Sequence, residues 1–246
     1  MVSSSLVNFY NRYHQKNEKY SSLIRKGNCT YWYILQLLHN PILSSAIKGS
    51  VLDVGTGVGT LALYLSQYAH SVAAIDVSDR AVSIARHAQR CLDIKNVEFK
   101  KTELKNKIGQ FDLVICSEVI EHVADDAKLL MLMRSNTRKG GYLVLTSPSR
   151  ANILFRLGYY ARFDTEVGHL RRYTEQELTT LVTDAGYSVV LVRSVEGPLR
   201  NMLFTSRLGI LLKLIKGPIV PAFHWLDQLS AWLLGASDIQ IIAQAV

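Results

Sequence analysis

The sequence has few cysteines and no long apolar run. Three of its 246 residues are cysteine and none belongs to a CxxC pair, so neither a disulfide framework nor a cysteine-rich zinc site is expected. The most apolar stretch, 208–234, is interrupted by two lysines, two prolines and Asp227. It therefore lacks the ~20 consecutive apolar residues that a membrane-spanning helix needs. Both shortages favour a protein of a reducing compartment that does not cross a membrane.

A secretory signal and an acidic surplus are also missing. The first twenty residues lack a basic leader followed by an apolar core, which predicts a cytoplasmic protein. The 20 Asp and Glu residues are outnumbered by 28 Lys and Arg residues, giving a formal charge of +8. Because 48% of the residues are hydrophobic and 20% are charged, the composition excludes a disordered chain and suits one large domain with additions.

The hydrophobic pattern changes near residue 50. From there, short β-branched runs alternate with longer amphipathic stretches, which predicts a parallel α/β sheet with helices on both faces. We expect 1–47 to form an N-terminal helical arm and 48–246 to form the sheet domain. Two apolar stretches, 148–170 and 196–237, are too long for simple turns and are predicted to be helical cap insertions. The final run, SDIQIIAQAV, predicts a closing strand.

A glycine-rich turn follows the first predicted strand. The sequence VLDV leads into Gly55-Thr56-Gly57-Val58-Gly59 and then into a helix. Glycines at such a turn allow tight bending and close approach of a ligand to the backbone. Asp76 ends the next strand, 21 residues after Gly55, where a carboxylate can accept both hydroxyls of a ribose. Together these features predict a nucleoside-binding site.

Two nucleoside ligands compete for this turn. A dinucleotide site favours GxGxxG, whereas this turn is GxGxG and Thr60 stands where the third glycine would be. Asp53 lies two residues before the first glycine. An acid at that position would repel a pyrophosphate but attract the cationic amino-acid part of S-adenosylmethionine. The residues therefore favour S-adenosylmethionine as the cofactor.

These motifs resemble the class I methyltransferases, in particular the branch of the ubiquinone-biosynthesis O-methyltransferases and related small-molecule enzymes. The resemblance covers about 49–195 and the closing strand. It implies a Rossmann-like, mostly parallel seven-stranded sheet whose last strand is antiparallel and inserted between the fifth and sixth. Thr102-Glu103 stands where family members commonly have Gly-Asp. The cofactor contacts that the resemblance implies are Asp53, Gly55, Thr56, Gly57, Gly59, Asp76, Val77, Thr102, Glu103 and Ser117.

Two histidines are candidate catalytic bases. His122 follows the fourth predicted strand, and His169 lies in the late motif GHLRRYT. A histidine titrates near neutral pH and can accept a proton from a hydroxyl acceptor. The alternative for each is a structural hydrogen bond to a neighbouring loop. Tyr10, Tyr13 and Tyr20 are candidates to cover the cofactor from the arm, or to be part of the core.

A metal site is a separate possibility raised by the same region. Glu118, Glu121 and His122 follow one another at i, i+3 and i+4, so a helical turn would bring their oxygen and nitrogen atoms to one face. In the ubiquinone branch, the resemblance associates this pattern with metal dependence. It implies a divalent cation such as Mg²⁺, although metal-independent relatives keep parts of the pattern.

Basic residues are concentrated in two stretches. Residues 127–163 contain seven Lys or Arg and 197–226 contain four, and neither stretch contains an acid. Both stretches are also rich in aliphatic and aromatic residues, as in helices that lie on anionic lipid. We expect peripheral contact with an anionic membrane; the alternatives are a simple cap or a dimer contact.

The predicted function is methyl transfer to an oxygen of a hydrophobic small molecule or lipid-like acceptor. Transfer to nitrogen or carbon is the next alternative. RNA methylation is disfavoured because Cys-Ser-Glu-Val follows the fourth strand in place of an Asn-Pro-Pro-Tyr-like turn, and its acid would repel phosphate. The fourth class is a protein that binds S-adenosylmethionine without catalysis. The sequence makes no prediction about the oligomeric state.

Overall fold

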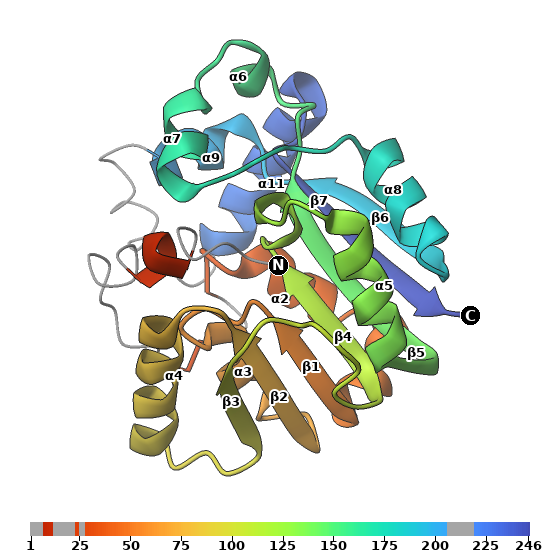
Figure 1. The fold of residues 1–246 in the computed structure, drawn as a ribbon. Coiled ribbons are helices and arrows are strands. Elements are labelled where there is room, and N and C mark those ends of the chain that lie inside the picture. Colours follow the sequence, from red (N-terminus) through yellow and green to blue (C-terminus); the bar gives the residue numbers. More distant parts are fainter. Residues whose placement is uncertain (1–6, 12–22, 25–27, 206–218) are drawn as a thin grey trace.

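The computed structural model describes residues 7–11, 23–24, 28–205 and 219–246. Its centre is a seven-stranded sheet with the order β3-β2-β1-β4-β5-β7-β6 (Figure 1). β7 is antiparallel to both of its neighbours, and the other pairings are parallel. This confirms the predicted fold, including the position of the closing strand. The strands are β1 (Ser50–Val54), β2 (Ser71–Asp76), β3 (Val97–Lys101), β4 (Phe111–Ser117), β5 (Thr137–Pro148), β6 (Tyr187–Val195) and β7 (Asp238–Ala245).

Helices cover both faces of the sheet. One apolar core packs α2 (Trp32–Leu38), α3 (Thr60–Leu65) and α4 (Asp79–Cys91) against one face. A second core packs α5 (Asp126–Asn136) and α8 (Glu175–Asp184) against the other. Neighbouring residues of β1 divide between them, since Val51 belongs to the first core and Leu52 to the second. Side chains alternate across a strand, so a strand buried on both faces must be continuously apolar.

Helix boundaries follow local sequence signals. Residue Ser78 caps α4 by accepting a hydrogen bond from the Ala81 amide at 3.2 Å. Thr174 and Glu177 form a capping box at the start of α8. Pro41 follows α2 and begins the short 3-10 helix η1 (Pro41–Leu43), which is followed by η2 (Ala46–Lys48). Residues 7–11 are also helical.

Four helices lie beyond the carboxyl ends of the parallel strands (Figure 1). They are α6 (Ile153–Arg156), α7 (Ala161–Val167), α9 (Pro198–Thr205) and α11 (Ile219–Leu234). Asp227 of α11 is fully buried and accepts hydrogen bonds from the Tyr33 hydroxyl at 2.9 Å and from the amides of Gly197 at 2.9 Å and Arg200 at 2.8 Å. One carboxylate therefore joins α2, α9 and α11. Within the described part of the chain, no helix combines the length and apolar character required to span a bilayer.

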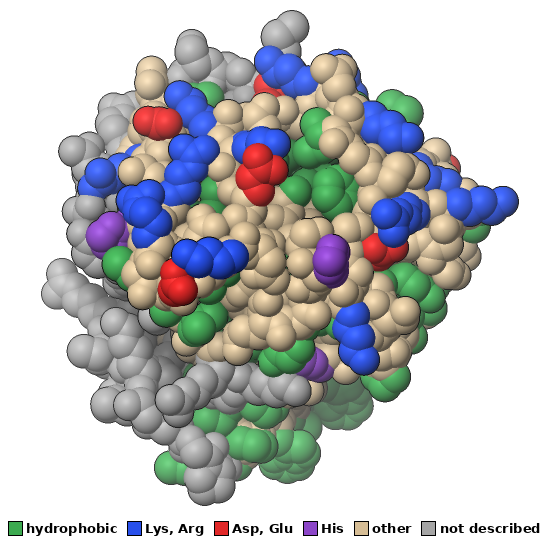
Figure 2. Space-filling model, turned by 90° about the horizontal axis from the view of Figure 1, so that it is seen from below, with side chains coloured by type: hydrophobic (Ala, Val, Ile, Leu, Met, Phe, Trp, Pro, Cys, Tyr) green, Lys and Arg blue, Asp and Glu red, His purple; other side chains and the backbone are tan. Residues whose placement is uncertain are grey.

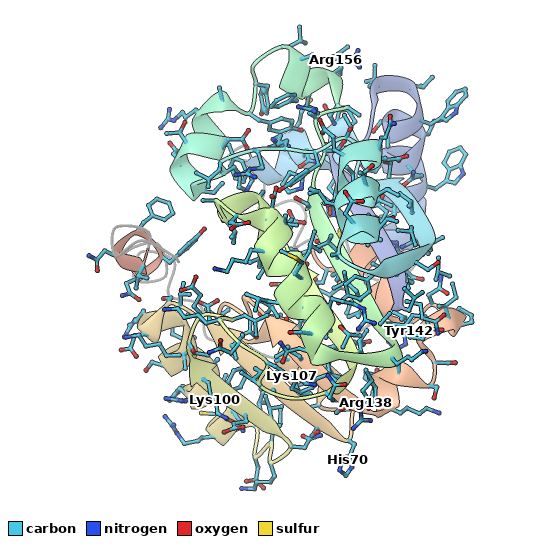
Figure 3. The ribbon with its side chains drawn as sticks, turned by 45° about the vertical axis from the view of Figure 1, so that its right-hand side comes forward. His70, Lys100, Lys107, Arg138, Tyr142 and Arg156 are labelled. Atoms are coloured by element: carbon cyan, nitrogen blue, oxygen red, sulfur yellow. The ribbon has the colours of Figure 1, made fainter. Side chains whose placement is uncertain are left out.

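The basic stretch 127–163 does not form a single surface. β5 extends through Lys139-Gly140-Gly141 and runs from one edge of the sheet to the other along the strand direction, with a register irregularity against β4. It therefore separates the basic residues that precede it from those that follow it. In Figure 3, Arg138 lies with His70 at one end of the molecule and Arg156 lies at the opposite end, on α6. Figure 2 shows the Arg138 end of the molecule, where Lys and Arg side chains are scattered among fewer acids. Of these labelled residues, only Arg156 therefore lies among the cap helices.

Candidate active site

A cavity of about 1470 Å³ opens at the carboxyl edge of the sheet. Its walls come from the ends of β1, β2 and β4, from the start of β7, and from α7, α9 and the helical residues 7–11. Ligand pockets typically enclose about 300–1,000 Å³. The cavity is large enough for two ligands side by side.

The glycine turn and Asp76 form one end of this cavity. Asp76 accepts hydrogen bonds from the Gly57 amide and the Ser78 amide, each at 2.8 Å. Gly55 has φ +74°, and a Cβ placed there would lie 2.3 Å from a methyl carbon of Val119. The turn therefore requires glycine at this position for both backbone and space. Gly55, Gly57 and Asp76 all line the cavity.

Asp53 and Gly59 lie behind the turn. The Asp53 carboxylate is 2% exposed and accepts a hydrogen bond from the Thr56 hydroxyl at 2.6 Å. Burial raises the pKa of Asp53 to about 6; the Thr56 hydrogen bond opposes this shift and the Asp76 charge adds to it. A Cβ on Gly59 would lie 2.8 Å from Ala85 and from the Phe99 ring. Neither Asp53 nor Gly59 lines the cavity. In this structure Asp53 instead holds the turn through Thr56, and Gly59 allows the turn to pack on Ala85 and Phe99.

The remaining predicted cofactor residues line the same end, apart from Thr56. Val77, Thr102, Glu103 and Ser117 are all on the cavity wall. The Thr102 amide donates to the carbonyl of Asp76 at 2.8 Å, which holds the residues after β3 beside the end of β2. The Ser117 and Thr146 hydroxyls are 3.0 Å apart. Gly57 and Ser117, which are sixty positions apart in the sequence, thus line the same cavity.

His122 and His169 both line the cavity, and their ring centroids lie 4.8 Å apart. His122 belongs to the 3-10 helix η3 (Ile120–His122), and its Nδ1 lies 3.0 Å from the Gly168 carbonyl. His169 Nδ1 lies 2.8 Å from Asp164 Oδ1. Because both partners are acceptors, each Nδ1 carries a proton and donates it to its partner. Burial lowers the pKa of His122 to about 4, the Gly168 carbonyl opposes that shift and His169 reinforces it, so the ring is neutral at pH 7.

Glu121 faces both imidazoles. Its side chain is 0% exposed, and its Oε1 lies 3.8 Å from Nε2 of His122 and 3.8 Å from Nε2 of His169. Oε1 receives no hydrogen bond from any described residue, whereas Oε2 accepts one from the Ser147 hydroxyl at 3.1 Å. Burial, and then the Glu118 charge, raise the pKa of Glu121 well above its usual range. The three side chains place potential metal ligands within 4.8 Å of one another.

The third predicted metal ligand, Glu118, points elsewhere. It has φ +56°, and its Oε1 accepts a hydrogen bond from the Thr146 hydroxyl at 2.6 Å. The structure therefore groups Glu121 and His122 with His169, which arrives from a segment almost fifty residues later.

Asp164 is a residue that the sequence interpretation missed. Its carboxylate holds His169 and also accepts two hydrogen bonds from Arg172, at 2.9 and 2.6 Å. The Arg172 guanidinium in turn lies over the Tyr160 ring at 4.5 Å. An acid five residues before a candidate histidine was the available signal. Tyr10 lines the cavity with its ring edge-on to His122, 5.6 Å between centroids; Tyr13 and Tyr20 lie outside the described residues.

Carboxyl groups beside three strand ends line a further part of the cavity wall. Glu118 follows β4, Glu196 follows β6, and Asp238 begins β7. All three line the cavity. Burial raises the pKa of Asp238 well above its usual range, and the charges of Glu118 and Glu196 add to that shift. None of the three was predicted to act together with the others.

Comparison with known proteins identifies related sequences. A family model described as a methyltransferase domain matches residues 31–192. The ubiquinone biosynthesis O-methyltransferase of Acinetobacter baumannii is 31% identical over 105 residues, 41% of this chain and 44% of that protein. A probable S-adenosylmethionine-dependent methyltransferase of Mycobacterium tuberculosis is 28% identical over 177 residues, 70% of this chain and 62% of that protein. The matched stretch thus spans less than half of the ubiquinone-biosynthesis relatives.

Solved structures share the fold at lower identity. Magnesium protoporphyrin IX methyltransferase from Synechocystis, with bound SAH, superposes with a TM-score of 0.62 at 17% identity, covering 99% of this chain and 95% of that one. Geranyl diphosphate C-methyltransferase from Streptomyces coelicolor, with Mg²⁺, geranyl diphosphate and S-adenosyl-L-homocysteine, gives 0.63 at 15% identity, covering 86% and 76%. At these identities the likeness concerns the fold.

Proposed function

This chain belongs to the family of class I S-adenosylmethionine-dependent methyltransferases, and on that premise we propose that it methylates an oxygen of a hydrophobic or lipid-like small molecule. One observation carries the proposal: the glycine turn, Asp76 and His122 line one cavity with room for two ligands. S-adenosylmethionine supplies an activated methyl group when bound. Catalysis then requires alignment of the acceptor, exclusion of water and a group that accepts the hydroxyl proton.

The residues at the glycine turn fit this cofactor. Gly55 leaves no space for a Cβ, so the backbone itself forms the wall of the cavity. Asp76 is positioned by two amides and keeps its carboxylate at the wall for the ribose hydroxyls. Val77, Thr102 and Glu103 would border the adenine, and Ser117 would border the methionine part.

His122 is the proposed base. Its Nδ1 proton is fixed on the Gly168 carbonyl, so its Nε2 lone pair is available. Burial keeps the ring neutral near pH 7, and a neutral imidazole can accept the acceptor's proton as its oxygen attacks. His169, fixed in the same way by Asp164, is the second candidate. Transfer to carbon or nitrogen is the alternative, since it places a weaker demand on a base.

A divalent cation is a further proposed component. Glu121 Oε1 is buried without a hydrogen-bond donor among the described residues, and it lies 3.8 Å from Nε2 of both His122 and His169. Buried polar atoms are normally satisfied, and a cation bound by Glu121, His122 and His169 would satisfy this one. The two imidazole ligands suit Zn²⁺ better than Mg²⁺, the sequence-based candidate, and the carboxylate also suits Mn²⁺. When bound, such an ion would lower the pKa of an acceptor hydroxyl.

The base and the metal interpretations make opposite predictions. Titration calorimetry with Mn²⁺ should detect one site that is lost in both Glu121→Gln and His169→Gln if the metal interpretation is correct. If Mn²⁺ does not bind, and dialysis against a chelator leaves turnover unchanged, the metal interpretation is wrong and the base interpretation remains.

Peripheral contact with an anionic membrane is proposed for α11. Trp225 and Trp232 are 67% and 79% exposed, and other large apolar side chains of this helix are exposed with them. The stretch 197–226 contains four basic residues and no acid, a composition that suits anionic headgroups; Arg200 is buried, and the other three lie outside the described residues. Cosedimentation with vesicles of anionic phospholipid should fall in the double variant Trp225→Ser/Trp232→Ser and should not occur with neutral vesicles. Equal sedimentation of the variant would disprove the contact.

The decisive test of the cofactor is titration calorimetry with S-adenosylmethionine, S-adenosylhomocysteine and NAD. Binding of the first two without NAD is expected, followed by methyl transfer to members of a panel of phenols and extracted lipids. Binding without transfer to any oxygen, nitrogen or carbon acceptor would favour the non-catalytic alternative. Binding of NAD alone would overturn the proposal.

A further inference from the structure

The end of the cap insertion 148–170 meets the active site at His169. Asp164 lies in the middle of α7, and the backbone turns at Gly168, whose φ is +82°. The Asp164 carbonyl accepts hydrogen bonds from the amides of Gly168 and His169, each at 2.9 Å. Its carboxylate accepts another from His169 Nδ1 at 2.8 Å. The backbone and the side chain of one cap residue therefore both hold His169.

Arg172 fixes the Asp164 carboxylate in turn. Its Nε donates to Oδ2 at 2.9 Å and its Nη2 to Oδ1 at 2.6 Å, and such paired hydrogen bonds set direction as well as charge. The guanidinium also lies over the rings of Tyr160 at 4.5 Å and Phe155 at 5.4 Å, both from the cap insertion. The Arg172 side chain is 5% exposed. Arg172 therefore ties the insertion to Asp164 and, through it, to His169.

The other nitrogen of the His169 ring faces the cavity residues. Nε2 lies 3.8 Å from Glu121 Oε1, and the ring centroid lies 4.8 Å from that of His122. Asp164 holds Nδ1 and is not one of the three residues whose potential ligand atoms lie together. A carboxylate bound to one imidazole nitrogen fixes the direction of the other. Asp164 thus reaches Glu121 and His122 through the His169 ring.

We propose that Asp164 and Arg172 are positioning residues, which hold the His169 ring with Nε2 toward Glu121, so that the cap insertion completes the active site. This inference rests on the proposed methyltransferase function. It applies equally to a His169 that binds a cation and to a His169 that accepts a proton, because both roles require Nε2 in a fixed direction. The insertion then does more than cover the acceptor.

Substitutions of Asp164 test the positioning role. Asp164→Ala should lower kcat about 10- to 100-fold, the usual effect of removing a residue that orients such a histidine, while the Kd for S-adenosylhomocysteine changes little. Asp164→Asn keeps one oxygen for Nδ1 and should retain more of the activity. The matched control is Glu166→Gln on the same helix, where Glu166 is 58% exposed and pairs with the exposed Arg162; its kcat should be unchanged.

Double variants show whether Asp164 acts through the imidazole. In a His169→Gln background, Asp164→Ala should lower kcat no further, because the ring that it orients is gone. Arg172→Lys keeps the charge and loses the paired hydrogen bonds, so it should lower kcat and add nothing to Asp164→Ala. Additive losses in both combinations would overturn the proposal, since Asp164 would then act on the reactants without His169.

An NMR signal of His169 provides a readout that does not depend on turnover. The Nδ1 proton should give a protected imidazole signal in ¹H–¹⁵N spectra, assigned by its loss in His169→Gln. It should be lost or shifted in Asp164→Ala and kept in Glu166→Gln. An unchanged signal in Asp164→Ala, or an unchanged kcat in that variant, would overturn the proposal. Absence of methyl transfer to every acceptor would instead contradict the proposed function, and the NMR signal would still decide whether Asp164 positions His169.

Discussion

The two ends of the cavity are built in different ways. The cofactor end comes mainly from one continuous stretch, 54–77, in which strand, turn, helix and strand follow one another. The part of the wall that holds the acids is assembled from the residues after β4 and β6, the start of β7 and the cap helices, which are separated by up to 120 residues. A local motif can therefore be recognised in a single sequence, whereas a site made by strand order becomes visible only in the fold.

The largest effect is expected on kcat, in a variant that should leave cofactor binding unchanged. Replacing His122 with Ala should lower kcat by about 10² to 10⁴, the usual contribution of a general base, because the Nε2 lone pair is lost. The Kd for S-adenosylhomocysteine should change little. Single-turnover assays together with calorimetry measure both quantities, and full turnover by the variant would rule out the base.

A pair of glycine variants tests the cofactor end. Gly55 and Gly158 both have φ +74°, but a Cβ would meet Val119 only at Gly55, and nothing lies within 4 Å at Gly158. Gly55→Ala should weaken S-adenosylhomocysteine binding about 100-fold, since backbone strain costs about 1–3 kcal/mol and the clash adds to it. Gly158→Ala carries the same strain and should bind normally. Similar affinities in both variants would mean that the turn does not contact the ligand.

The third prediction concerns the cap helices. Asp227→Ala removes the acceptor shared by Tyr33, Gly197 and Arg200, leaving buried donors unsatisfied. We expect a loss of about 2–4 kcal/mol in the free energy of unfolding. Gln228→Ala is the control, because the neighbouring Gln228 is exposed and makes one 3.3 Å hydrogen bond to the Ser194 carbonyl. Urea unfolding with equal midpoints for the two variants would contradict the role of Asp227.

The smallest expected effect is a pH dependence of the free energy of unfolding, caused by His224 in the same cap. Burial, with Arg200 nearby, lowers the pKa of His224 to about 4, whereas an unfolded histidine has a pKa near 6.5. The unfolded chain binds the proton first, so this stabilising contribution is complete above about pH 6.5 and is lost as the pH falls toward 4. The loss should reach at most about 3 kcal/mol.

A ring substitution isolates that contribution. His224→Phe keeps an aromatic ring against Trp32, whose ring stacks on His224 at 4.9 Å. Urea unfolding at pH 7.0 and pH 4.5 should show a smaller acid destabilisation in the variant. If both proteins lose the same stability on acidification, His224 is not the group responsible.

The comparison also explains which predictions the sequence supported. The alternation of strands and helices followed from hydrophobic periodicity, the position of the last strand from the family resemblance, and the places of Gly55, Gly57 and Asp76 from one contiguous motif. Periodicity does not reveal that Gly59 packs on Ala85 and Phe99 instead of facing the cavity. It is equally silent about the meeting of Glu121 with His169, because that contact depends on how the chain returns after β5. Long-range contacts of this kind carry no local signal.

The direction of β7 has a practical consequence. An antiparallel strand contributes its first residue, Asp238, to the cavity and carries its last residues to the opposite edge, where the chain terminus lies far from the cap (Figure 1). A fluorescent partner or a surface linker joined after Val246 would therefore leave the entrance of the cavity unobstructed. Immobilised through that end, the protein would present the entrance of the cavity to solution, the orientation needed to screen small molecules or vesicles in flow.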